Sequence, residues 1–432
     1  MDFSDFLILF SFLSEVVLLL FLELKAWGTL YTPLNFLMLP YTVVLLITIL
    51  LAGNFGFVEF HYPSIAIWSV GLLLFSIPSF VLGTLLAKYS KPNKSVIETT
   101  ALSKRLVIIS IFVGFLLLFK FYGTLKSSVA LIGTDDFAED FSGHGIWAHI
   151  RQLSVPLLAI CIYFLGKRRL WLIPVLLCLL LPNIINMVKG VIIITILSGM
   201  LLRLYAGKTR LNGKFIFITV GSGFLLFFVF YIVLPLLGKG ESNITDEHIA
   251  FVFKHFGHYL TSGILGLSED MIRNYPDASF IDIILSPFIN IYNQIAGIDE
   301  ILSPVNPYYH TTGQNLTNVR TFFGTLFIYT NWFQFTIYTL FVSLIFYMIK
   351  ICTIKFNNIY VYGIYFYECS LLAMGWFEFY FFHLSAIEIP LMFLGLLFIS
   401  RLQLCSGSIS LENIRKGSND MLIQEARKEK DI

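Results

Sequence analysis

The segment PNIINMVKGVIIITILSGMLLRLY, residues 182–205, is almost wholly apolar after Val188, yet it carries one lysine, Lys189. Apolar runs of about 20 residues recur along the chain, and each is long enough to cross the roughly 30 Å hydrocarbon layer of a bilayer. An ammonium group is costly inside that layer. The depth at which Lys189 lies therefore bears on its function.

The composition indicates a membrane protein. Of the 432 residues, 57% are hydrophobic and 13% are charged, and the mean hydropathy is +0.80, whereas a soluble domain has about 25% charged residues. We predict an all-α, polytopic integral membrane protein. The net charge of +2 is small, and we expect no nucleic-acid partner. The five cysteines lie in apolar spans or in the polar tail, so no disulfide framework is predicted.

We expect about eleven transmembrane helices, in a single transmembrane domain over residues 1–402, followed by a cytoplasmic tail over residues 403–432. A large loop, residues 239–325, separates the eighth and ninth spans and is too long to be only a connector. The predicted spans are 5–24, 36–54, 64–87, 106–124, 153–166, 170–186, 190–206, 215–237, 326–349, 359–377 and 384–402.

The distribution of basic residues predicts the orientation. Most of the 29 lysines and arginines fall in one set of loops, which includes GKRR, RLYAGKTRLNGK and KICTIK. By the positive-inside rule these loops are cytoplasmic. The N-terminus is then outside and the C-terminus inside. All 8 histidines fall on the outer side or at outer span ends, which favours that face as the place of any chemistry.

With this orientation, Lys189 lies at the outer start of the seventh span. A cation beside a helix N-terminus at headgroup level is suited to bind an anion, and Gly190 permits close approach of a ligand to the backbone. The alternative is a lysine that only contacts lipid phosphate. Arg151, Arg273 and Arg320 are predicted to lie at the same level, where arginine can bind phosphate in a bidentate manner.

Residues 246–271 have the three- and four-residue spacing of apolar positions that is typical of a helix. A polar stripe about 80° wide lies on another face of this helix, at roughly 100° per residue. Its side chains are candidates for a general base and for hydrogen bonds to sugar hydroxyls; a solvated face on an interfacial helix is the alternative. Two histidines three residues apart are too few for zinc, so we expect no metal. The stripe comprises His248, His255, His258, Ser262 and Glu269.

Two further segments complete the large loop. Residues 276–299 are apolar on much of their surface but interrupted by Pro287, and we interpret them as an amphipathic cap on the outer leaflet. Residues 306–332 are rich in Tyr, Thr, Asn and Gln, which suit sugar binding, and His310 and Arg320 are their titratable side chains.

The roles of several other acidic residues remain open. Asp135 and Asp136, in the earlier outer loop, are candidates for metal binding or acid–base chemistry, or form a solvated turn. Glutamates within the spans are costly enough to indicate a partner or a polar cavity. Those predicted there are Glu15, Glu368, Glu378 and Glu388. The chain lacks a Walker loop, a Rossmann glycine fingerprint and a G-x-S-x-G elbow, so we expect no nucleotide chemistry and no cofactor.

Three short motifs resemble the O-antigen polymerases, the Wzy-like oligosaccharide repeat-unit polymerases. NMVKGVIII is similar to the family's Lys/Arg-Gly at the start of a mid-chain span. HYLTSGILGL is similar to its Tyr-x-x-x-Gly segment, with Tyr259 in the tyrosine position. TNVRTFFGTLFIYTNW is similar to its Asn-x-x-Thr-Phe stretch, with Asn318 and Thr321. The chain has NWF where the family often has Asp-x-Gly, so no role for that aspartate is transferred.

The resemblance implies a reaction at the periplasmic face of the bacterial inner membrane. A glycan on undecaprenyl pyrophosphate is transferred to the terminal sugar of a lipid-linked repeat unit, which gives O-antigen or a similar surface polysaccharide. The expected partners are the undecaprenyl-pyrophosphate-linked oligosaccharide and membrane lipid, with a chain-length regulator protein as a candidate. Under this hypothesis the catalytic candidates are His310, His258, His255 and Glu269, and the substrate-binding candidates are Lys189, Arg320, Arg151, Arg273, Gly190, Tyr259, Asn318 and Thr321.

Two other functions stay open. A flippase for lipid-linked oligosaccharides would have charged residues deep in many spans, short loops and often an internal repeat. A glycosyltransferase that uses a sugar on polyprenyl phosphate would usually place acidic residues in an early outer loop, and Asp135 and Asp136 keep that alternative open.

The predicted orientation can be tested with reporter fusions. Fusions at Lys94, Lys208 and Gln403 should report a cytoplasmic location, because the basic loops remain inside. Fusions at Ser142 and Ser279 should report a periplasmic one. A periplasmic signal at Lys208 would reverse the placement of Lys189 and contradict the anion-binding hypothesis.

Overall fold

The computed structural model divides the chain into two units, Met1–Leu396 and Leu397–Ile432, and the first unit contains nearly all of the described elements. The predicted all-α class is confirmed for this unit: apart from one two-stranded hairpin, its described elements are helices. The structure describes residues 2–86, 102–128, 135–142, 145–185, 189–213, 245–273, 280–303 and 306–401, with isolated positions between 221 and 229. Apart from those isolated positions, the predicted span 215–237 lies outside the described residues, as does the predicted tail 403–432.

The first helices follow from sequence signals at their ends. The Asp2 carboxylate accepts a hydrogen bond from the Asp5 N–H at 2.8 Å and caps α1 (Phe3–Trp27), which ends at Gly28 with a φ of 64°. Proline opens α2 (Pro33–Leu51), where its missing N–H costs nothing. The turn η1 (Tyr62–Ser64) leads into α3 (Ile65–Leu86).

The remaining described elements are helices of different lengths and one short hairpin. After α3 come α5 (Lys104–Ser128), α6 (Asp135–Ser142), α7 (Gly145–Phe164), η3 (Lys167–Arg169), α8 (Leu172–Ile185) and α9 (Lys189–Tyr205). The large loop contributes α12 (Asp246–Ile272), α13 (Phe280–Ile283), α14 (Ser286–Ala296), β1 (His310–Thr311), β2 (Leu316–Thr317) and α15 (Phe322–Ile328). The chain then forms α16 (Trp332–Phe356), α17 (Ile359–Ala373), η5 (Tyr380–Phe382) and α18 (Ser385–Arg401).

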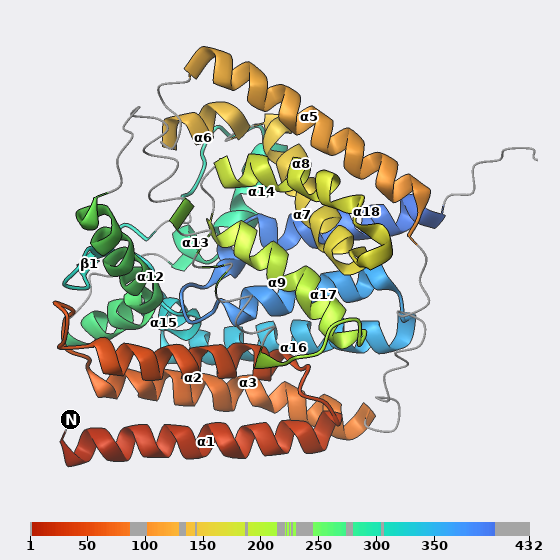
Figure 1. Cartoon of the computed structure of the whole chain (residues 1–432). Coiled ribbons are helices and arrows are strands. Elements are labelled where there is room, and N and C mark those ends of the chain that lie inside the picture. Colours follow the sequence, from red (N-terminus) through yellow and green to blue (C-terminus); the bar gives the residue numbers. More distant parts are fainter. Residues whose placement is uncertain are drawn as a thin grey trace, which may run out of the picture. The chain divides into compact units, whose positions relative to one another are not determined.

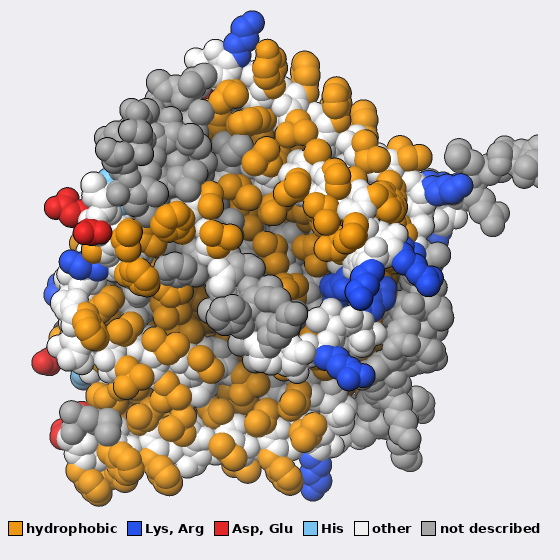
Figure 2. Space-filling view, in the orientation of Figure 1, with side chains coloured by type: hydrophobic (Ala, Val, Ile, Leu, Met, Phe, Trp, Pro, Cys, Tyr) orange, Lys and Arg blue, Asp and Glu red, His pale blue; other side chains and the backbone are white. Residues whose placement is uncertain are grey.

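Six of the described helices are long and apolar enough to cross a membrane, and α8, α9 and α17 are shorter apolar helices. The chain is therefore a helical membrane protein, while the predicted count of about eleven spans stays a prediction. Large apolar side chains cover the face shown in Figure 2. Phe10, Phe115 and Phe119 are each more than half exposed, as expected of helices that face lipid and not water.

Helix α17 joins two groups of helices. It contacts α2 and α16 of a group that also includes α1 and α3, and it contacts α9, which packs on α7 (Figure 1). α5 and α8 complete the second group. The main core lies in the first group and includes Trp68, which stacks on Tyr41 at 3.4 Å between ring centres. α12 packs on α2, so the large loop is attached to this rigid core.

The boundary predicted for the ninth span is wrong. Residues 326–349 were expected to form one span, but α15 ends at Ile328 and α16 starts at Trp332. The cause is a capping box, in which the Asn331 side chain accepts from the Gln334 N–H at 2.9 Å and the Gln334 side chain accepts from the Asn331 N–H at 3.1 Å. The assignment of Lys350 to a cytoplasmic loop is also wrong, because this residue is buried within α16.

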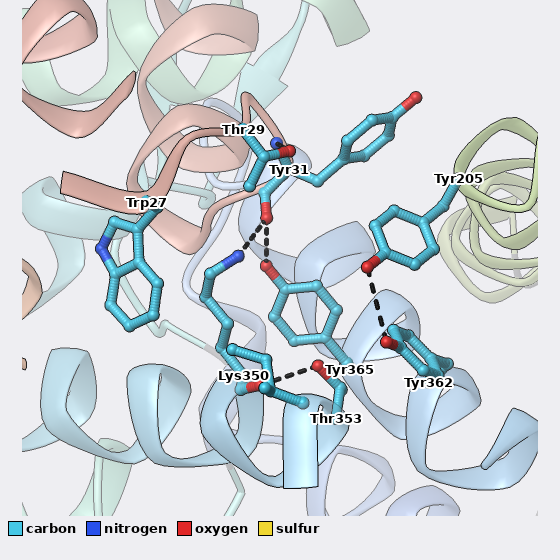
Figure 3. Close-up of a pocket in the computed structure, with 9 residues that line it drawn as sticks. Trp27, Thr29, Tyr31, Tyr205, Lys350, Thr353, Tyr362 and Tyr365 are labelled. Atoms are coloured by element: carbon cyan, nitrogen blue, oxygen red, sulfur yellow. Dashed lines mark hydrogen bonds between the residues drawn. The ribbon is translucent and has the colours of Figure 1, made fainter. Parts of the chain in front are cut away.

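Lys350 belongs to a buried polar network. Its Nζ donates to the main-chain oxygen of Tyr31 at 2.6 Å, and the Tyr365 hydroxyl donates to the same oxygen at 2.8 Å (Figure 3). The Nζ also lies 5.1 Å from the centre of the Trp27 ring, within range of a cation–π interaction. Because Tyr31 lies between α1 and α2, Lys350 of α16 and Tyr365 of α17 together hold this connection against both helices.

The carboxylate of Glu23 is the acidic member of this network. It accepts hydrogen bonds from the Ser79 hydroxyl at 2.5 Å and from the Tyr347 hydroxyl. The Ser79 oxygen in turn accepts from the Trp27 indole at 2.9 Å. Glu23 and Tyr347 are both fully buried, so each hydrogen bond satisfies a group that would otherwise be costly.

We expect Tyr347→Phe to lower the free energy of unfolding by about 1–3 kcal/mol, because it leaves one oxygen of the buried Glu23 carboxylate without its donor. Tyr122→Phe is the matched control, since Tyr122 is 67% exposed on α5. Thermal unfolding of both variants in the same detergent measures the difference. Equal effects of the two substitutions would contradict the role assigned to Tyr347.

Candidate functional site

Helix α12 is the element on which the candidate site is built. The prediction of a helix over 246–271 is confirmed, and neither Gly257 nor Gly263 breaks it. The Thr245 side chain caps its start, and residues 261–270 are buried without exception. The interpretation of the polar stripe as a solvated face is therefore wrong for this half of the helix, since Ser262 and Glu269 lie inside the protein.

Two glycines let other segments approach α12 closely. A Cβ at Gly263 would lie 2.4 Å from the main-chain oxygen of Phe377, and one at Gly266 would lie 2.7 Å from that of Val319. The first contact holds the segment after α17 against the helix. The second holds the segment before α15, which brings Arg320 over the last turns of α12.

A buried ion pair joins Arg320 to Asp270. The guanidinium donates through Nε to Asp270 Oδ2 and through Nη2 to Oδ1 at 3.1 Å, and Nη1 donates to the Val319 oxygen at 3.0 Å. The Arg320 residue is 1% exposed. Two parallel hydrogen bonds of this kind fix both orientation and distance. Removal of either partner would leave a buried charge without compensation, which costs about 3–5 kcal/mol.

His310 is the third member of the cluster. Its Nε2 lies 2.5 Å from Asp270 Oδ1. The residue is placed by the pairing of β1 with β2, in which His310 lies opposite Thr317. Burial and the charge of Arg320 lower the pKa of His310, although the neighbouring Asp270 acts in the opposite direction. A neutral imidazole that donates Nε2–H to Asp270 carries its lone pair on Nδ1, which is the tautomer of a general base held by a carboxylate.

Two histidines of the polar stripe on α12, His258 and His255, differ in their surroundings. His258 is buried, its Nδ1 lies 2.8 Å from the Thr312 hydroxyl, and burial lowers the pKa of its imidazole to about 4. His255 stacks on Phe251 and contacts the edge of Tyr259. Tyr259 stacks on Phe377 at 6.0 Å, so this part of α12 has an aromatic surface.

The substrate-binding candidates next to Arg320 have structural contacts of their own. Thr321 caps α15 and accepts a hydrogen bond from the Trp68 indole at 2.9 Å. The Asn318 amide donates to the Asn306 oxygen and to the Tyr309 hydroxyl, each at 3.3 Å. Both side chains therefore hold the segment that carries Arg320.

The two other arginines predicted to bind substrate, Arg273 and Arg151, each lie next to an acidic residue. Arg273 pairs with Glu269 at 3.3 Å on the last turn of α12. Arg151 of α7 lies near Glu388 of α18, and the Glu388 carboxylate is 2.5 Å from the His149 ring. The structure thus brings Arg320 and Arg273 to one end of α12, while Arg151 belongs to a different acidic partner.

Lys189 is the first residue of α9. The next residue, Gly190, lies against η5, since a Cβ on it would be 3.3 Å from the Tyr380 hydroxyl. The segment that leads to η5 packs on Gly263 of α12 through Phe377. The start of α9 and the aromatic part of α12 are therefore both attached to residues 376–383.

A family model for a family of unknown function, DUF6337, matches residues 56–406. The chain belongs to this family. No curated protein and no solved structure matches it significantly. The matched region of the DUF6337 chain includes α12, the hairpin and all members of the Arg320–Asp270–His310 cluster.

Asp270, the centre of the cluster, was not among the site residues predicted from the sequence. It follows Glu269, and adjacent acids before an arginine are common on solvated helices. The signal that could have distinguished it is the mainly apolar segment 264–267, which lies within one helical turn before it and predicts burial of that part of the helix. Within the part of the chain that the structure describes, no group of three or more His, Cys, Asp or Glu is arranged to hold a metal.

The lowered pKa of His258 predicts acid sensitivity. Between about pH 6.5 and pH 4 the unfolded chain binds a proton at this histidine while the folded protein does not. The free energy of unfolding should therefore fall as the pH is lowered through this window, and level off above it.

Unfolding measured from pH 4 to pH 8 should show a smaller loss in His258→Gln than in the wild type. His61→Gln, which removes a histidine outside α12, is the control. An unchanged pH profile in His258→Gln would mean that the imidazole titrates normally in the fold.

Proposed function

We propose that this chain polymerises undecaprenyl-pyrophosphate-linked oligosaccharide repeat units into O-antigen or a similar surface polysaccharide. The observation that carries the proposal is the buried Arg320–Asp270–His310 cluster in the large loop. It combines a histidine suited to act as a general base with the motif segment TNVRTFFGTLFIYTNW, which resembles the Wzy-like polymerases. The motif segment HYLTSGILGL lies on the helix that supplies Asp270.

In the proposed reaction, His310 accepts the proton of a sugar hydroxyl through Nδ1 as the hydroxyl oxygen attacks the anomeric carbon of the growing glycan. The bond from that carbon to the phosphate oxygen breaks, and undecaprenyl pyrophosphate leaves with the electron pair. Asp270 keeps His310 in the required tautomer and stabilises its protonated form. Arg320 acts through Asp270, because its guanidinium is bound to that carboxylate.

The charge of the leaving group requires cations at the headgroup level. We assign this role to Lys189 and to the N–H groups at the start of α9, which favour anions. Tyr259, Phe377 and Tyr380 offer aromatic faces between this helix start and α12, and aromatic rings suit the apolar faces of sugars. The proposed location is the periplasmic face of the bacterial inner membrane, with the N-terminus outside and the C-terminus in the cytoplasm.

One observation favours a flippase as the second candidate. Glu23 and Lys350 are buried among the apolar helices, and intramembrane charges commonly mark transport pathways. Deletion in the native host separates the two functions. Loss of a polymerase should leave lipid A core that bears a single repeat unit, whereas loss of a flippase should leave none.

Transfer with purified protein and lipid-linked repeat unit, normalised to folded protein, tests the residue roles. We expect His310→Gln to slow transfer by about 10²–10⁴-fold, the usual contribution of a general base. Lys189→Ala should slow it by roughly ten- to a hundredfold, the value of one charge-assisted contact, and Lys189→Arg should retain part of the activity.

Lys254→Ala is the matched control, because Lys254 is exposed on α12. It should transfer at the wild-type rate. Wild-type rates in both His310→Gln and Lys189→Ala would reject the proposed mechanism. A stable protein without any transfer activity, combined with loss of all repeat units in the deletion strain, would favour the flippase.

A further inference from the structure

A mainly apolar cavity of about 180 Å³ lies between α14, α16, α17 and the segment from η5 to the start of α18. Phenylalanine rings supply much of its wall. Three of its lining side chains, Phe288, Phe341 and Ile345, are also exposed at 57%, 57% and 42%. The cavity therefore borders the apolar surface of the helices, from which a molecule dissolved in the bilayer can reach it.

One ionisable carboxyl, that of Glu368, lines this cavity. Glu368 is 5% exposed and lies on α17, five residues before the helix ends at Ala373, which corresponds to about 7.5 Å along the axis. Among the described residues, no hydrogen bond or ion pair reaches its carboxyl group. The other buried acids differ: Glu23 binds Ser79 and Tyr347, and Asp270 binds Arg320.

An uncompensated carboxylate in an apolar wall is costly. A ligand with a positive charge removes that cost, and the rings of Phe341, Phe379 and Phe381 in the same wall attract a cation through their π faces. A neutral apolar ligand would fill the same volume without this attraction. The ionised form of the Glu368 carboxyl therefore distinguishes a cationic ligand from a neutral one.

We propose that this cavity binds a membrane-soluble molecule that has an apolar body and one cationic nitrogen, with the nitrogen placed at Glu368. The site is separate from the Arg320–Asp270–His310 cluster, although Phe379 and Phe381 of its wall contact Phe322 at the start of α15. It does not depend on the proposed polymerase activity, since it rests only on the cavity and its charge.

The test is equilibrium binding to the full chain in lipid nanodiscs, with empty nanodiscs as the blank for partition into lipid. The probes are radiolabelled 4-phenylbutyl-trimethylammonium and its carbon isostere, in which a tert-butyl group replaces the trimethylammonium group. Shape and apolar surface are then the same, and only the charge differs. We expect the wild type to bind the cation about tenfold or more tightly than the isostere, as for a desolvated charge pair with aromatic neighbours.

Glu368→Gln should abolish this preference and leave the isostere binding as before. Ala386→Phe, which fills the cavity from α18, should abolish binding of both probes. Glu59→Gln, at an exposed glutamate outside the cavity, should behave like the wild type. Equal binding of the two probes by the wild type, or a preference that persists in Glu368→Gln, would overturn the proposal. If Glu368→Gln does not fold, loss of both probes in Ala386→Phe together with a cation preference in the wild type still supports it.

Discussion

The ion pair between Arg320 and Asp270 is the interaction on which the organisation of the large loop depends. It joins the last turns of α12 to the segment between β2 and α15, which are 50 residues apart in sequence. A buried charge pair contributes little net stability by itself, because desolvation offsets much of the attraction. Its effect is to exclude other arrangements: with one partner displaced, the second charge would be buried alone. The close approach at Gly266 and the Thr321 cap of α15 hold the chain on either side of Arg320 in the position that this pairing requires.

The cost of a buried charge without a partner also explains how the apolar helices accommodate charged residues. Glu23 is bound by two hydroxyl groups, Lys350 by a main-chain oxygen and an indole ring, and Glu388 by His149. Each group lies where partners from two or three helices meet, so these polar contacts also fix the register of the helices. Glu368 is the exception among these residues. The packing of the described residues gives its carboxyl group no such contact, which is the basis of the cation site proposed for the cavity that it lines.

Much of the fold could be predicted from the sequence, because local signals determine helices in membranes. Apolar runs and the spacing within 246–271 predicted most helices that the structure contains, including α12, α17 and α18. The errors arose where a local signal competed with the hydrophobic pattern. The capping box at Asn331 divides one apolar run into α15 and α16, and Lys350 was assigned to a loop because its partners at Trp27 and Tyr31 are more than 300 residues away.

For the candidate site, residue type alone identified His310 and Arg320 as candidates. Asp270 could not be recognised, since its importance comes from a contact that only the folded chain creates.

The pairing of Arg320 changes the chemical role that its position suggested. A buried guanidinium whose Nε and Nη2 are bound to Asp270 and whose Nη1 is bound to a main-chain oxygen already has its charge compensated within the protein. Its charge still acts on the neighbouring histidine, because it lowers the pKa of His310 while Asp270 raises it. Burial adds to the effect of Arg320, so the net shift favours the neutral imidazole, which is the form that can accept a proton. Under the proposed function, charge stabilisation of a phosphate and activation of a hydroxyl would then be divided between two places, the start of α9 and the His310 cluster, which residues 376–383 and α12 connect.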